Sequence, residues 1–150
     1  RPLMIDKLSV SRVINAELKD CHALVSDIEG YGTWVSDLKE VAIENRDDEG
    51  RVTEATFRVA AMGRSARYSL AYDHSDAPSA IRWELVTGDI VKRLDGSYSF
   101  ESVLDEPTQT EVIYELALEL AVPLPGFVKR RAEGRIAHAA LDDLQAQLEH

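Results

Sequence analysis

The sequence has little of several features that would point to a particular chemistry or location. Its 150 residues contain a single cysteine, Cys21, so no disulfide can form within the chain, as is usual in a reducing cytoplasm. No stretch approaches the ~18 consecutive apolar residues of a membrane-spanning helix. The first ten residues, RPLMIDKLSV, lack the apolar core of a secretory signal. These absences predict a cytoplasmic protein without integral membrane association.

Positive charge is also scarce. The chain has 17 Lys and Arg against 27 Asp and Glu, a net charge of −10, and shows no basic stripe. This balance argues against binding nucleic acid or an anionic membrane. The chain also lacks a nucleophile-elbow motif, a phosphate-binding glycine loop and any metal-ligand spacing. We therefore expect neither a metal nor an organic cofactor.

What the sequence does contain is regular alternation of apolar and polar residues, the pattern of half-buried strands. The alternating segments are residues 7–16, 40–45, 51–61, 64–73, 79–87, 91–103 and 110–120. Short turn-rich connections predict an antiparallel meander over residues 41–120, with the first segment at its edge. Helical spacing from Leu18 predicts a first helix that stops at Gly30, followed by a short helix over residues 32–37.

One face of this predicted sheet carries no charge, and it must be covered. The cover is the helix predicted from Phe127 on, whose apolar stripe consists of Gly134, Ala137, Leu141, Leu144 and Leu148. A curved sheet of about seven strands has more apolar area than one helix can cover. The remaining space is either a second core layer or a ligand cavity. A glycine inside a helix costs up to ~1 kcal/mol, so Gly134 favours a cavity, although close helix–sheet packing explains it equally well.

The order of these elements resembles the START/Bet v1-like helix-grip superfamily, and within it the polyketide cyclase/dehydrase-like family. The motifs that carry the resemblance are VINA (13–16), LVSDIEGYGTWV (24–35), LDGSYSF (94–100), TEVIYELALEL (110–120) and VPLPGFVKRRAE (122–133). The resemblance implies an α+β fold in which the sheet wraps around the long helix. The length predicts one domain over residues 1–150, and the last three residues, 148–150, are interpreted as a tag remnant. We expect a monomer or weak homodimer.

The resemblance and the inward positions together predict the lining of a ligand cavity. The expected lining residues are Tyr31, Trp34, Phe57, Val59, Tyr68, Leu70, Tyr72, Trp83, Tyr98, Phe100, Tyr114 and Gly134. The resemblance implies that the segment with Tyr31 and Trp34 lies at the cavity mouth, opposite the start of the long helix. The alternative is that Trp34 simply caps the core.

Three charged residues are candidates for polar groups at the cavity mouth. Arg12 follows Leu8 and Val10 at even spacing, so it points either inward or into solvent at a strand end. Arg130 and Glu133 lie on the leucine side of the long helix, where they either pair in water or grip a ligand. No catalytic residue can be named, because the inward face offers tyrosines and tryptophan but no His, Asp, Glu, Lys or Arg.

The sequence therefore predicts a protein that binds or carries a hydrophobic small molecule, lipid-, quinone- or polyketide-like. A cofactor-free polyketide cyclase/dehydratase of the aromatase/cyclase type is the alternative. It requires a charged group inside, whereas Arg58, Arg67 and Arg82 have outward parity. A one-residue bulge would reverse that parity for a single strand. A protein-interaction module is a second alternative, and it requires an exposed apolar patch on the outer face.

Overall fold

The alternating segments form strands, and the turn-rich segments connect neighbours. The computed structural model describes residues 7–61 and 63–150. Its elements are β1 (Leu8–Ile14), α1 (Leu18–Ser26), the 3₁₀ helix η1 (Ile28–Thr33), β2 (Leu38–Arg46), β3 (Val52–Ala61), β4 (Arg64–Asp73), β5 (Ala80–Gly88), β6 (Val91–Val103), β7 (Glu106–Leu120) and α2 (Gly126–Glu149).

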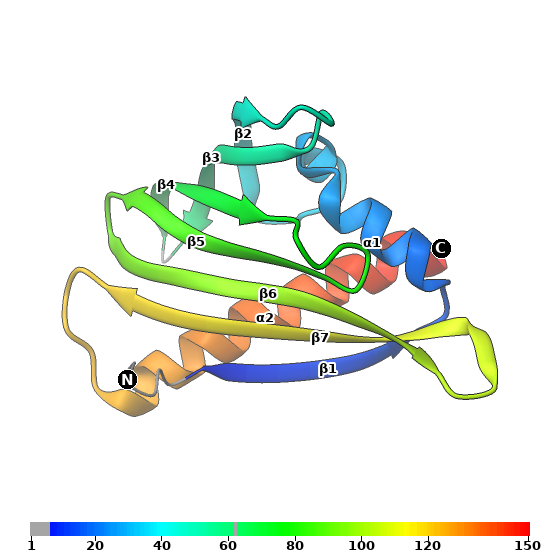
Figure 1. Ribbon diagram of the computed structural model, residues 1–150. Helices are drawn as coiled ribbons and strands as arrows, with labels where there is room; N and C mark the ends of the chain where they lie inside the picture. The colour runs from blue at the N-terminus through cyan, green and yellow to red at the C-terminus, as the bar shows by residue number, and fades with distance from the viewer. Residues whose placement is uncertain (1–6, 62) are drawn as a thin grey trace, which may run out of the picture.

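The strands form one antiparallel sheet with the order β1-β7-β6-β5-β4-β3-β2. The meander predicted for residues 41–120 is therefore confirmed, as is the position of the first strand, which pairs with β7 at the edge of the meander. Figure 1 shows the sheet curving around α2, with α1 and η1 at one end. This is the helix-grip fold of the α+β class that the sequence predicted.

The inward and outward faces also follow the predicted alternation. Phe57, Trp83 and Tyr98 are buried on the side of the sheet that carries the apolar residues. On the outer side, Arg58 binds Glu40, Arg82 binds Asp76, and Arg93 binds Glu119 and Asp95. The register shifts in the sheet do not turn Arg58 or Arg82 inward, because both pair with acids at the exposed surface.

The predicted apolar stripe of α2 faces the sheet. Pro125 stands at the helix N-cap, where its missing N–H costs nothing, and the helix continues to Glu149. Ala137, Leu141 and Leu144 are fully buried. Full burial of a leucine contributes ~1.5–3 kcal/mol, so this stripe holds the helix against the sheet.

The two short helices differ from the prediction in their boundaries. Helix α1 ends at Ser26 instead of running to Gly30, and η1 covers Ile28–Thr33 instead of residues 32–37. Asp27 interrupts the α-helical backbone with a ψ of 73°. The Tyr31 hydroxyl then donates to the carbonyl of Val25, one of the carbonyls left open by the end of α1. Trp34 follows η1 as its C-cap.

Candidate functional site

The concave face gathers the aromatic side chains that the sequence placed inward. Tyr98 and Tyr114 lie edge to face with ring centroids 5.0 Å apart, and Trp83 is 5.7 Å from each. A second group forms beside η1, where the Tyr31 and Trp34 rings are 5.2 Å apart and Phe57 stacks on Tyr31. Both groups belong to one hydrophobic core. The predicted lining residues that lie in this core or pack against it are Tyr31, Trp34, Phe57, Val59, Tyr68, Leu70, Tyr72, Trp83, Tyr98, Phe100 and Tyr114.

The tyrosine hydroxyls on this face differ in their hydrogen bonding. Tyr31 donates to the carbonyl of Val25. Among the described residues, none hydrogen-bonds the hydroxyls of Tyr68, Tyr72, Tyr98 or Tyr114. The buried side-chain atoms that are both fully enclosed and unpartnered are His22 Nε2, Trp34 Nε1 and His74 Nδ1, for the described part of the chain. The four hydroxyls are not in that set, so each borders accessible space instead of packed protein atoms.

Burial sets the protonation state of these phenols. It raises the pKa of Tyr68 to about 12, and it raises the pKa of Tyr72, Tyr98 and Tyr114 well above the ordinary value. All four are therefore neutral at pH 7 and act as hydrogen-bond donors. As bases they are poor.

Helix α2 has open space beside Gly134. A Cβ built on Gly134 would meet nothing within 4 Å. Close packing against the sheet, the alternative explanation for this glycine, is therefore not what the structure shows. The neighbouring stripe residues Ala137 and Leu141 are fully buried, so the open space is local to the N-terminal half of the helix.

The three charged residues expected at the cavity mouth lie in different surroundings. Glu133 is only 3% exposed, and its Oε2 accepts a hydrogen bond of 3.0 Å from the N–H of Leu118. Its carboxylate is therefore buried against β7 instead of lying in water. Arg130 is exposed near Gly126.

Arg12 lies far along the helix from Arg130 and Glu133. Its Nη1 is 2.6 Å from Asp142 Oδ1 and 3.2 Å from Gln145 Oε1. Arg12 thus points toward α2, and its side chain joins β1 to the C-terminal half of that helix.

The resemblance implied that the segment after α1 lies opposite the start of the long helix. The structure places it elsewhere. Ser36, two residues beyond Trp34, donates from its N–H and its Oγ to Asp143 Oδ2, at 3.0 and 2.9 Å. This contact places the segment beside the C-terminal half of α2. The reason is that η1 packs on β2, an edge strand of the sheet, and this holds the segment at the end closed by α1.

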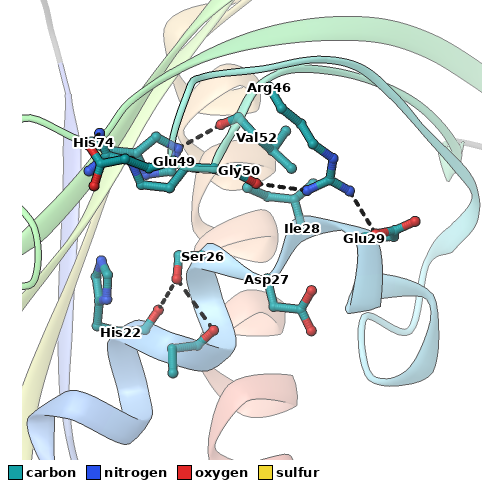
Figure 2. Close-up of a pocket in the computed structure, with 12 residues that line it drawn as sticks. His22, Ser26, Asp27, Ile28, Glu29, Arg46, Glu49, Gly50, Val52 and His74 are labelled. Atoms are coloured by element: carbon teal, nitrogen blue, oxygen red, sulfur yellow. Dashed lines mark hydrogen bonds and ion pairs between the residues drawn. The ribbon is translucent and has the colours of Figure 1, made fainter.

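Sequence reasoning missed a pocket of about 360 Å³ between α1, η1 and the β2–β3 turn. Figure 2 shows His22 rising from α1 on the side of the pocket where His74 lies. His74 Nε2 is 2.6 Å from the carbonyl oxygen of Val52 and donates a hydrogen bond to it. Burial, followed by the proximity of His74, lowers the pKa of His22.

The far side of that pocket is closed by Arg46. Its guanidinium donates to the carbonyl of Gly50 at 2.9 Å and pairs with Glu29 at 2.7 Å, joining the β2–β3 turn to η1 (Figure 2). No local sequence signal marks this pocket, because its residues come from three separate segments, 22–29, 46–52 and His74. Within residues 7–61 and 63–150, no three His, Cys, Asp or Glu side chains are grouped to hold a metal ion.

No helix in the described part of the chain is both long and apolar enough to cross a membrane.

Comparison with solved structures shows the same fold in proteins of diverse origin. A START superfamily protein from Mycobacterium smegmatis matches with 23% identity and a TM-score of 0.89, over 95% of this chain and 97% of that one. A Streptomyces aromatase/cyclase matches with 15% identity and a TM-score of 0.81, over 97% and 94%. A major latex-like protein from Panax ginseng matches with 12% identity and a TM-score of 0.70, over 95% and 97%. At these identities the likeness concerns the fold alone.

In sequence, no curated protein matches the chain. The profile of one family, described as "Polyketide cyclase / dehydrase and lipid transport", matches residues 14–145. That match contains both short helices, six of the seven strands and nearly all of α2. The chain therefore belongs to the polyketide cyclase/dehydrase and lipid transport family.

Proposed function

We propose that the protein binds and carries a hydrophobic small molecule in the space between the concave face of the sheet and α2. The observation that carries the proposal is the set of tyrosine hydroxyls of Tyr68, Tyr72, Tyr98 and Tyr114, which border space and lack a partner among the described residues. A core that existed only for stability would not leave four such donors unpaired. The open position at Gly134 on the facing helix supports the same conclusion.

The chemistry of the lining limits the classes of ligand that fit. If a ligand buried about 300 Å² of apolar surface, it would gain roughly 7–8 kcal/mol before association costs of ~4 kcal/mol or more. Apolar contact alone therefore gives weak binding. The neutral phenols add hydrogen-bond donors, so a quinone-, polyketide- or lipid-like molecule with carbonyl or hydroxyl oxygens fits better than a plain hydrocarbon.

The test combines native mass spectrometry with a quinone titration. An added mass on the purified protein that disappears on denaturation identifies a carried ligand. Binding of menadione, followed by tryptophan fluorescence, should weaken by about 2–10-fold in Tyr98→Phe and Tyr114→Phe, because each loses one hydrogen bond. Tyr31→Phe is the matched control, since its hydroxyl already donates to Val25. Equal affinity in all three variants, or no ligand with any quinone, fatty acid or aromatic polyketide, contradicts the proposal.

A cofactor-free polyketide cyclase or dehydratase is the second candidate, and one observation favours it. Glu133 is a buried carboxylate on the face of α2 that packs toward the sheet. A base in an apolar site is what enolate chemistry needs. Against this candidate, Arg58 and Arg82 pair with acids on the outer side. Glu133→Gln distinguishes the two, because a cyclase loses turnover whereas a carrier keeps its affinity for menadione.

A further inference from the structure

The loop between β7 and α2 exposes large apolar side chains at one end of the molecule. Val122 is 68% exposed, and Phe127, in the first turn of α2, is 64% exposed. Prolines at positions 123 and 125 keep this loop extended. The loop lies at the same end as the β5–β6 turn, to which Ala121 is bonded through Ile90 (Figure 1). Exposed aromatic and branched side chains in one short segment indicate a contact surface.

Basic residues follow these apolar side chains in the sequence. Residues 121–136 contain Lys129, Arg130, Arg131 and Arg135 and a single acid, Glu133, which is buried against β7. Phe127, Arg131 and Arg135 are spaced by four, so they share one face of α2, and all three are exposed. The surface presented here is therefore apolar at its tip and cationic behind it, in a protein whose net charge is −10.

Two of these cations are unfavourably placed with respect to the helix dipole. Lys129 and Arg131 lie in the first two turns of α2, where the helix dipole is positive and basic side chains are unfavourable. The first turn holds no acid, and the N-cap residue Pro125 makes no side-chain capping bond. An anionic surface that met these side chains would remove this disadvantage.

We propose that this segment, residues 121–135, docks the protein on an anionic lipid bilayer. Phe127 and Val122 would insert at the headgroup level, while Lys129, Arg131 and Arg135 contact lipid phosphates. A short apolar tip combined with a basic cluster supplies the two contributions that peripheral binding requires. The overall negative charge does not prevent this, because charges more than ~8–10 Å from the bilayer are screened at physiological salt. The proposal does not depend on the cavity holding a ligand.

Vesicle flotation tests the docking surface. The full chain should float with phosphatidylcholine vesicles that contain about a third phosphatidylglycerol, and it should not float with pure phosphatidylcholine. Phe127→Ser should lower the bound fraction several-fold, whereas the matched Leu104→Ser, at an 87% exposed leucine of the β6–β7 turn, should not. Arg131→Gln with Arg135→Gln should lower vesicle affinity roughly tenfold or more. Lys19→Gln with Lys39→Gln, which changes the net charge equally, should leave it unchanged.

Three results would overturn the proposal. The first is no flotation with either vesicle, and the second is an equal loss in the Leu104 and Lys19/Lys39 controls. The third is a concentration-dependent dimer in light scattering that Phe127→Ser abolishes, which would assign the surface to self-association. Circular dichroism of each variant establishes that a lost signal comes from the surface and not from unfolding. Because flotation needs no ligand, its failure is separable from a failure to bind menadione.

Discussion

At the scale of single residues, the concave face depends on a glycine that lies beneath a tryptophan. A Cβ built on Gly96 would lie 2.6 Å from the Trp83 ring and 2.5 Å from the backbone oxygen of Glu115. The indole thus occupies the volume that any larger residue at position 96 would need. This contact fixes Trp83 against the aromatic group of Tyr98 and Tyr114.

We expect Gly96→Ala to destabilise the protein by ~1–3 kcal/mol, because the backbone oxygen cannot move away as the ring can. Urea unfolding measures the loss of stability, and near-ultraviolet circular dichroism should report the displaced indole. An unchanged near-ultraviolet spectrum together with unchanged stability would show that the close approach of Trp83 is wrong.

Gly134 on α2 differs from Gly96, because a larger side chain has room there. Nothing lies within 4 Å of a Cβ built there, and the residue is helical. Gly134→Ala should therefore stabilise the protein by ~0.5–1 kcal/mol in the same urea experiment, through helix propensity alone. Gly134→Leu should fill the open space and weaken menadione binding if that space belongs to the ligand cavity. A destabilised alanine variant would contradict the open space itself.

At the scale of the element, α2 is held by its leucines. Leu141 is fully buried against the sheet, so Leu141→Ala should cost ~2–5 kcal/mol of unfolding free energy. Leu104→Ala makes the same chemical change at an 87% exposed position and should stay within ~0.5 kcal/mol of the wild type. Chemical denaturation of the two variants is the measurement. A similar cost for both would mean that α2 does not depend on this stripe.

The elements were predictable to different degrees. The strands at residues 64–73 and 91–103 have the predicted bounds, because strict alternation and turn residues at both ends leave one solution. The 3₁₀ helix η1 was misplaced, since so short an element has no apolar period and its position depends on the bond from Tyr31 to Val25.

For the candidate site, the sequence predicted only which residues lie on the concave face of the sheet. Parity located the aromatic residues of the concave side, but it could not show which polar groups meet across the fold. The burial of Glu133 joins α2 to β7, and the approach of His22 to His74 joins α1 to the β4–β5 turn. Such long-range meetings leave no pattern within a short window of sequence.

At the scale of the whole molecule, the curved sheet places all five tyrosines of the chain in the interior. The order β1 to β2 across the sheet leaves two free edges, and the sheet curves around α2 with its apolar face inward (Figure 1). Burial raises the pKa of every one of these phenols, including Tyr31. The fold is therefore linked as a unit to their protonation.

This linkage predicts alkaline unfolding with a defined sign. The folded-state pKa values lie above the unfolded value of ~10, so their contribution to stability is complete below pH ~10 and is lost as pH rises through the folded-state values. Tyr68 alone, with a pKa of about 12, should account for a loss of about 2 kcal/mol by pH 12. Tyrosinate absorbance at 295 nm should therefore appear together with the loss of far-ultraviolet circular dichroism, in one transition above pH ~10.

Tyr98→Phe serves as the comparison, because it removes one of the linked groups and should make the alkaline loss of stability less steep. If tyrosinate absorbance instead rises near pH ~10 while the circular dichroism stays native, water reaches the phenols freely in the folded protein. The concave face would then be an open groove, and the strong burial that raises these pKa values would be wrong.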